Sequence, residues 1–170
     1  MIQKCSYLNV LEVFFVEPNT IHFIKEIGKR IDLAPTSVRN NIKDLLSQNL
    51  IKIKKSRPFD GFTADRENEN FIFYKKIYNL YILRELSVFL AEAYFPQVMS
   101  VYGSYCRGED IEKSDIDIFI LSKSKKEVDL KKFEDRLKRK IHLFITDDLN
   151  KIEDKLLKKI QNGTILYGGF

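Results

Sequence analysis

Cysteine, proline and glycine are scarce in this chain of 170 residues, and no long apolar run is present. The two cysteines, Cys5 and Cys106, provide neither a disulfide framework nor a Cys-x-x-Cys metal motif. Four prolines and seven glycines argue against long flexible linkers. No stretch approaches the roughly 20 apolar residues of a membrane span, and residues 8–16 lack the features of a signal peptide. We therefore expect a cytoplasmic protein without a membrane partner.

The sequence does contain enough apolar material for a core, and its charge is unevenly distributed. Hydrophobic residues make up 44%, which is ordinary for a globular protein, and the length suits one medium domain or two small ones. The net charge is +5, but residues 20–57 hold nine basic and three acidic residues, a local charge of +6. Positive charge concentrated in this way attracts polyanions, nucleic acid first among them.

Three short helices are predicted at the start of the chain. The first covers residues 7–16, with Leu8 among the residues of its apolar face. Thr20 suits the N-cap of the second helix. The third begins at Pro35, a residue tolerated in the first turn of a helix, and ends near Asn49, which suits a left-handed cap.

A two-stranded hairpin is predicted next. In the first strand, Ile51 and Ile53 alternate with outward-facing lysines. A loop containing Asp60-Gly61 leads to a second strand-like run at residues 71–74. Three helices followed by a hairpin with a basic tip resemble winged helix-turn-helix DNA-binding domains, with Ala34-Pro35-Thr36-Ser37-Val38-Arg39 opening the recognition helix.

The winged-helix resemblance implies duplex DNA as a partner. In such domains the recognition helix enters the major groove, and the wing touches the backbone or the minor groove. The candidate contacts are, on the recognition helix, Ser37, Arg39, Asn40 and Lys43 and, on the wing, Lys52, Lys54, Lys55 and Arg57. A protein-interaction domain kept soluble by its basic residues is the alternative, and the sequence also leaves a homodimer open.

Strands and helices alternate in the second half, after a helical stretch at residues 76–95 whose apolar positions include Ile77. Strands are predicted at 98–102, 116–121 and 141–145, and the last helix at about 149–161. The fold class is therefore α+β: a winged helix-turn-helix in residues 1–75, then a small α/β domain with a short mixed sheet in residues 76–170.

Two acidic residues and a glycine-serine turn form the chemically distinctive part of this half. Asp115 and Asp117 are two apart on a strand, so their side chains point to the same face. Two carboxylates aimed at one spot repel each other unless a cation such as Mg²⁺ or Mn²⁺ lies between them. Gly103-Ser104 ends the preceding strand, where backbone amides and a hydroxyl can face a phosphate. A solvated strand edge is the alternative interpretation of the acidic pair.

Residues 101–108 and 114–118 resemble the minimal nucleotidyltransferases of the DNA polymerase β superfamily. The resemblance implies transfer of a nucleotidyl group, commonly AMP from ATP or another NTP, to a hydroxyl acceptor. It also implies a metal site at Asp115 and Asp117 and a nucleotide site formed by Gly103, Ser104, Arg107 and Ser114. Related minimal domains act as antitoxins that adenylylate a toxin, so a protein acceptor is credible. The fusion resembles prokaryotic, particularly archaeal, proteins.

One position departs from the family pattern. Active members carry a third carboxylate on the next strand, where this sequence has His142. A neutral imidazole can act as a general base, because its unperturbed pKa lies near 6.5. Alternatively, His142 is a structural residue in a regulator that senses nucleotide without transferring it. Asp147 or Asp148 replaces the missing acid only if the strand ends early.

Overall fold

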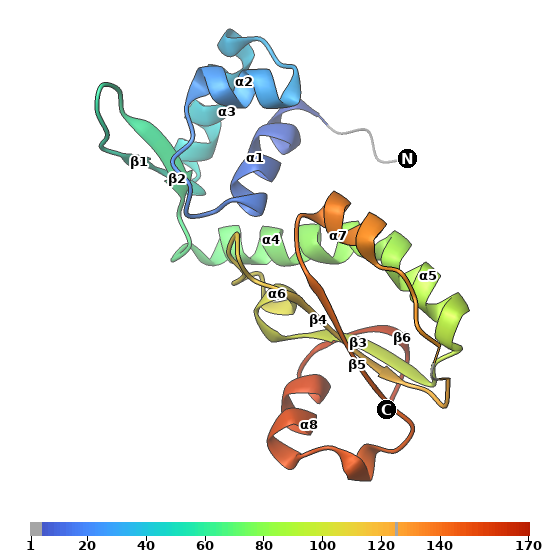
Figure 1. Cartoon of the computed structure of the whole chain (residues 1–170). Coiled ribbons are helices and arrows are strands. Elements are labelled where there is room, and N and C mark those ends of the chain that lie inside the picture. The colour runs from blue at the N-terminus through green and yellow to red at the C-terminus, as the bar shows by residue number, and fades with distance from the viewer. Residues whose placement is uncertain (1–4, 125) are drawn as a thin grey trace. The chain divides into compact units, whose positions relative to one another are not determined.

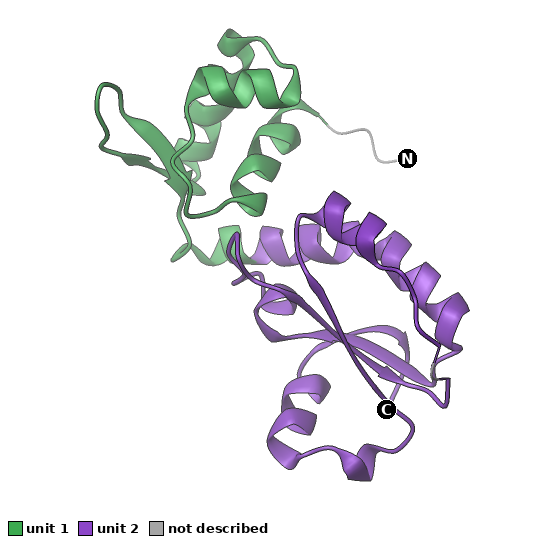
Figure 2. Ribbon diagram, viewed as in Figure 1, with its two compact units in different colours: residues 1–72 green, residues 73–170 purple. Residues whose placement is uncertain are grey.

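The protein folds into two compact units, residues 1–72 and residues 73–170 (Figure 2). A computed structural model describes residues 5–124 and 126–170. The fold class is α+β, as predicted from the sequence. No helix in the described part of the chain is both long enough and apolar enough to cross a membrane.

The N-terminal unit consists of three helices and an antiparallel hairpin (Figure 1). Pro35 occupies the first turn of the third helix, and Asn49 has a left-handed φ of 55°, as the sequence predicts. The core includes Val10, Phe14, Ile27, Val38 and Leu45, which are buried. The elements are α1 (Ser6–Val16), α2 (Ile24–Ile31), α3 (Pro35–Ser47), β1 (Ile51–Lys54) and β2 (Gly61–Ala64).

Several details of the N-terminal prediction are wrong. The chain is extended around His22, whose N–H donates to the Phe62 carbonyl at 2.8 Å, so α2 begins at Ile24 and Thr20 is not its N-cap. Leu8 and Ile53 point to solvent, with 43% and 55% of their surface exposed. The second strand is β2, formed ten residues earlier than predicted, because it pairs with β1 directly across the loop.

The second unit begins within a long helix and is built around a four-stranded sheet. The strand order is β5-β4-β3-β6, in which β4 and β5 are parallel and the other pairs are antiparallel, so the sheet is mixed, as predicted. The elements are α4 (Glu69–Ile82), α5 (Arg84–Tyr94), β3 (Val98–Tyr102), α6 (Gly103–Arg107), β4 (Ile116–Leu121), α7 (Lys131–Leu137), β5 (Ile141–Thr146), a 3-10 turn (Leu149–Lys151), α8 (Asp154–Gln161) and β6 (Thr164–Gly168).

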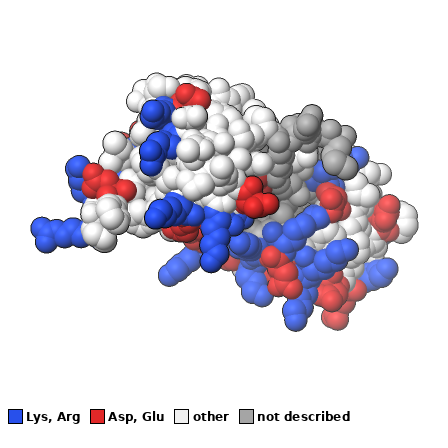
Figure 3. Space-filling view, turned by 90° about the horizontal axis from the view of Figure 1, so that it is seen from above, with Lys and Arg blue, Asp and Glu red and all other residues white. Residues whose placement is uncertain are grey.

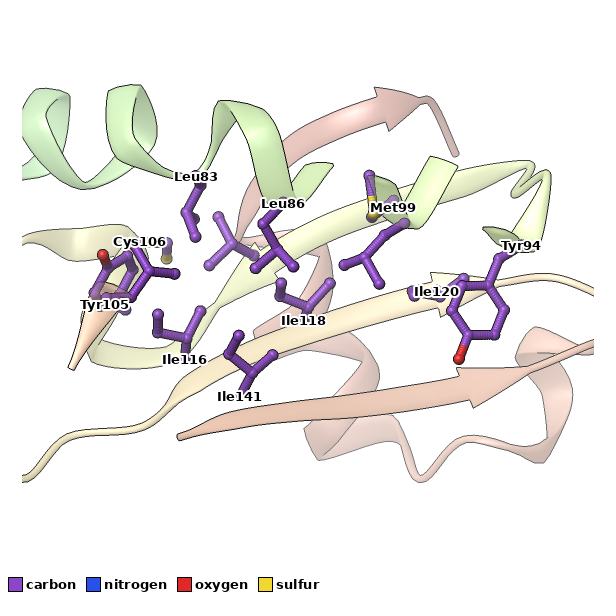
Figure 4. Packing of buried hydrophobic residues seen from close by; sticks show 13 residues of the cluster. Leu83, Leu86, Tyr94, Met99, Tyr105, Cys106, Ile116, Ile118, Ile120 and Ile141 are labelled. Atoms are coloured by element: carbon purple, nitrogen blue, oxygen red, sulfur yellow. The ribbon is translucent and has the colours of Figure 1, made fainter. Parts of the chain in front are cut away.

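Alternation along the strands gives the sheet two buried faces. Ile116, Ile118 and Ile120 pack with Leu86 and Leu90 of α5 on one face (Figure 4). Phe119 and Leu121 point the other way and pack with residues of α8. Helices therefore cover both faces, with α5 and α7 on one side and α8 on the other (Figure 1). Asp117, which alternates with Ile116 and Ile118, lies on the α8 side.

The helices that flank the sheet differ from the prediction. Residues 71–74 belong to α4, whose start is fixed by the Asn68 side-chain oxygen accepting from the Phe71 N–H at 3.1 Å. The stretch 76–95 is two helices rather than one. Ile77 is 51% exposed, because Lys75 and Asn79 occupy the buried side of α4 instead. Residues 149–161 divide into a 3-10 turn and α8.

Candidate functional site

Asp115, Asp117 and His142 come together at the edge of the sheet where β4 and β5 begin. Asp117 and His142 are register partners on these parallel strands. The His142 Nδ1 atom lies 3.7 Å from an Asp117 carboxylate oxygen and 3.9 Å from one of Asp115. Because a single imidazole nitrogen lies close to both acids, the two carboxylates face one patch, as their spacing predicts.

The Gly103-Ser104 turn lies directly against this acidic pair. Tyr102, the last residue of β3, is the register partner of Asp117, so the following residue enters the turn beside that carboxylate. Gly103 has a φ of +78°, and a Cβ atom there would lie 2.9 Å from the Asp117 Oδ2 atom. Any side chain would therefore combine a disfavoured backbone conformation with a steric conflict against the acid.

Burial and neighbouring charges together set the pKa of Asp117. Desolvation by burial, and then the neighbouring Asp115 carboxylate, raise its pKa above the ordinary value, while His142 and Lys159 of α8 oppose this shift. The Asp117 charge in turn adds to burial in raising the pKa of Tyr102. A carboxylate whose ionised form is disfavoured is a natural ligand for a cation, because the cation restores the balance of charge.

The site fits a divalent cation shared with a substrate. Asp115 and Asp117 supply carboxylate oxygens, the ligands that Mg²⁺ and Mn²⁺ prefer. No group of three or more His, Cys, Asp and Glu side chains within residues 5–124 and 126–170 is placed to hold a metal ion. Mg²⁺ commonly binds through one or two carboxylates, with waters and substrate phosphates completing its shell. The pair therefore suits a cation that arrives with a nucleotide.

The other predicted nucleotide residues lie along the segment between Gly103 and Asp115. The Ser104 carbonyl accepts from the Glu109 N–H at 3.0 Å, which closes the turn after α6. Arg107 is exposed, and its Nε donates to Glu109 at 2.7 Å. An exposed pair of this kind is worth less than about 1 kcal/mol and is readily exchanged for a phosphate. The Ser114 hydroxyl accepts from the Ile111 N–H at 2.9 Å and shapes the turn into Asp115.

The alternative acids on β5 lie elsewhere. The strand runs to Thr146, so neither Asp147 nor Asp148 reaches the position of the missing carboxylate. Asp147 pairs with Lys151 at 2.7 Å and lines a cavity of about 640 Å³ at the opposite, carboxyl ends of β4 and β5. Asp148 caps the 3-10 turn. None of the predicted nucleotide or metal residues lines this cavity.

Most of the predicted DNA-binding residues are exposed. Arg39, Asn40 and Lys43 lie on the solvent side of α3, and Ser37 is half-buried. On the hairpin, all four basic residues are exposed, and two of them also form ion pairs, Lys52 with Asp65 and Lys55 with Asp60. Basic side chains, with acidic ones among them, are spread over the face seen in Figure 3.

Two features near the site were not predicted from the sequence. The charge of Lys159 on α8 lowers the pKa of Asp117, and this electrostatic effect joins residues distant in the sequence. A buried polar group on α4, Lys75 and Asn79, contacts Asp110 in the segment between Gly103 and Asp115. Its signal was present, because Phe71, Lys75 and Asn79 recur every four residues on one helical face.

Comparison with known proteins identifies the second unit. The family model described as "Polymerase beta, Nucleotidyltransferase" matches residues 84–169. No curated protein sequence matches the chain. A solved structure of a mutant of Lactococcus lactis ZitR aligns with a TM-score of 0.40 and 16% sequence identity. The alignment covers 54% of this chain and 62% of the ZitR chain.

Proposed function

Because the chain belongs to the polymerase β nucleotidyltransferase family, we propose that its second unit transfers a nucleotidyl group from a nucleoside triphosphate to a hydroxyl acceptor. AMP from ATP is the expected donor group, and an acceptor on a partner protein, such as a toxin, is one candidate. The observation that carries this proposal is the convergence of Asp115 and Asp117 beside the Gly103-Ser104 turn.

In this proposal each side of the site has a separate task. Gly103 lets a phosphate approach the backbone closely, and the Ser104 hydroxyl and Arg107 guanidinium can donate to phosphate oxygens. Asp115 and Asp117 would hold a divalent cation, which supplies positive charge to the triphosphate oxygens. The acceptor hydroxyl oxygen forms a bond to the α-phosphorus, and the bond from that phosphorus to pyrophosphate breaks.

His142 accepts the proton that the acceptor hydroxyl loses. Its side chain is 63% exposed, so an incoming acceptor can reach the imidazole. The His142 Nδ1 atom lies within 3.9 Å of both carboxylates, so the imidazole stands beside the acidic pair where the acceptor would react. His142 also supports a second candidate function, because the family's third carboxylate is missing here. In that case the unit binds nucleotide as a sensor and performs no transfer.

We further propose that the N-terminal unit is a winged helix-turn-helix that binds duplex DNA. Its three helices and hairpin occur in the required order. The α3 side chains Arg39, Asn40 and Lys43 are exposed, as contacts to DNA require. The two proposals are compatible, since one concerns each unit.

Nucleotide binding and transfer by the Asp115→Asn, Asp117→Asn double variant test the main proposal. Binding of a labelled NTP in the presence of Mg²⁺ or Mn²⁺ is measured first, followed by transfer of label to components of a cell extract. We expect the double variant to lose metal-dependent binding, because its amides cannot balance the cation's charge. The matched control, Asp32→Asn with Asp135→Asn, makes the same charge change at two exposed positions and should bind normally.

Three outcomes separate the candidates. Binding with transfer supports the enzyme, and binding without transfer under any metal supports the sensor. Equal binding by the double variant and the unaltered chain would show that the nucleotide site lies elsewhere.

A further inference from the structure

A charged residue and an amide are buried on α4, where the apolar side of the helix would be expected. Lys75 and Asn79 are 1% and 2% exposed, while Ile77 on the same helix faces solvent. Burying a lysine is costly unless its charge is paired and its hydrogen bonds are made. The partners that offset this cost therefore indicate what the two side chains hold in place.

Both side chains converge on Asp110, which is itself 1% exposed. The Lys75 Nζ atom lies 3.2 Å from the Asp110 Oδ2 atom and also donates to the Asp110 carbonyl. The Asn79 Nδ2 atom donates to Asp110 Oδ1 at 2.8 Å. Arg139, just before β5, places its Nη2 atom 3.7 Å from the same carboxylate. We refer to Lys75, Asn79, Asp110 and Arg139 as the Asp110 cluster.

Asn79 makes a second contact, which reaches the nucleotide turn. Its Nδ2 atom also donates to the carbonyl of Tyr105 at 2.8 Å. Tyr105 lies in α6, the short helix that begins with Gly103 and Ser104. One amide group therefore joins the helix of the phosphate-facing turn to the carboxylate of Asp110.

Asp110 stands near the middle of the segment that links the two parts of the site. On one side, the Glu109 N–H donates to the Ser104 carbonyl at 3.0 Å. On the other side, residues 111 and 114 close a turn through two hydrogen bonds, and Asp115 follows. The Gly103-Ser104 turn and the acidic pair are thus separated by one segment, whose midpoint is anchored to α4 and to the start of β5.

We propose that Asn79, acting with Asp110, is a positioning residue that sets the Gly103-Ser104 turn at the correct place relative to Asp115 and Asp117. The inference rests on the proposed nucleotide site. Buried ion pairs contribute little net stability, and apolar residues of similar volume often replace them at no cost. We therefore infer that the Asp110 cluster fixes the position of the turn. A nucleotide must contact the turn and the metal ligands at once, and a displacement of about 1 Å between them is costly in such sites.

The test compares two ligands on the same variants. Asn79→Leu keeps the side-chain size and the Lys75–Asp110 pair but removes both amide hydrogen bonds. Mn²⁺ alone, measured by electron paramagnetic resonance, reports the acidic pair; ATP with Mn²⁺ reports the pair and the turn together. We expect Mn²⁺ affinity within about twofold of the unaltered chain and ATP affinity reduced about tenfold or more.

Two further variants test whether a loss of ATP affinity comes only from a disturbed fold. Asn70→Leu makes the same change at an exposed position of α4 and should leave both affinities unchanged. Asn79→Ser keeps a polar group that is too short to make both hydrogen bonds, and it should weaken ATP binding in the same selective way. It replaces Asn79→Leu in the test if that variant has a reduced folded fraction. Combining Asn79→Leu with Ser104→Ala should give less than the sum of the separate losses, because both act on one turn.

Each remaining result overturns the inference. Equal ATP affinity in Asn79→Leu and the unaltered chain shows that Asn79 does not position the turn, while the proposed function stands. A parallel loss of Mn²⁺ and ATP binding in both Asn79 variants assigns Asn79 a structural role only. No ATP binding by the unaltered chain removes the proposed function together with this inference.

Discussion

At the scale of single residues, the site is defined by groups held in unfavourable states. Gly103 has a positive φ beside the Asp117 carboxylate, and Asp117 is partly desolvated next to Asp115. Such arrangements are common where function takes precedence over stability. The sequence placed these residues in one predicted site because the motif is local, running only from Gly103 to Asp117.

Asp117→Asn should therefore stabilise the metal-free chain at neutral pH. The folded-state pKa of Asp117 lies above its ordinary value of 3.8, so the stability linked to its proton is present below that value and is lost as the pH rises through the raised pKa. The amide cannot ionise and avoids this loss. The gain should stay below about 1 kcal/mol, because the side chain is 36% exposed and screened by solvent.

Urea unfolding without metal, at pH 7 and at successively lower pH, measures this difference. The difference in unfolding free energy between the variant and the unaltered chain should become smaller as the pH falls. A variant less stable than the unaltered chain at pH 7 would mean that the attraction to His142 and Lys159 outweighs the cost of burial.

At the scale of elements, the three strands predicted for the second unit were easier to predict than its helices. β3, β4 and β5 are mostly apolar runs bounded by polar or glycine residues, and their limits agree with the prediction to within one residue. β6 was missed because it is an edge strand with exposed Ile165 and Tyr167. The α4 helix was misjudged because its buried side carries Lys75 and Asn79, which apolar periodicity cannot identify. Their partner Asp110 lies over 30 residues away.

Alanine substitutions on α4 and α5 distinguish the observed helix face from the predicted one. Ile77→Ala should change the free energy of unfolding by no more than about 0.5 kcal/mol, because Ile77 is half exposed. Leu86→Ala removes a fully buried side chain and should cost about 2–5 kcal/mol. Urea titrations of both variants provide the comparison. A large cost for Ile77→Ala would show that this face is covered by another surface.

At the scale of the whole molecule, charge is concentrated more narrowly than composition suggests. The net charge of the chain is +5, yet the segment from residue 20 to residue 57 alone carries +6. Burial does not remove this excess, because the basic residues proposed for DNA contact are exposed. A positive field of this kind increases the affinity for any polyanion. An experiment on DNA binding therefore has to distinguish contacts made by α3 from nonspecific electrostatic attraction.

Arg39→Ala with Lys43→Ala should weaken duplex DNA binding and reduce its salt dependence. If both side chains contact phosphates, the slope of log affinity against log salt should fall by about 2. The control is Lys131→Ala with Lys132→Ala, which removes the same charge from exposed positions of α7. Fluorescence anisotropy across a salt series measures both. Equal losses in the two variants would attribute binding to overall charge and not to α3.

Phe71 and Lys75 stand one turn apart on α4, yet they serve different units. The ring centroids of Phe71 and Phe15 lie 5.3 Å apart in the first unit, and Lys75 pairs with Asp110 in the second. Each unit therefore has its own anchor on this helix. Replacing Phe71 would disturb the core of the first unit, whereas replacing Lys75 would disturb the Asp110 cluster of the second.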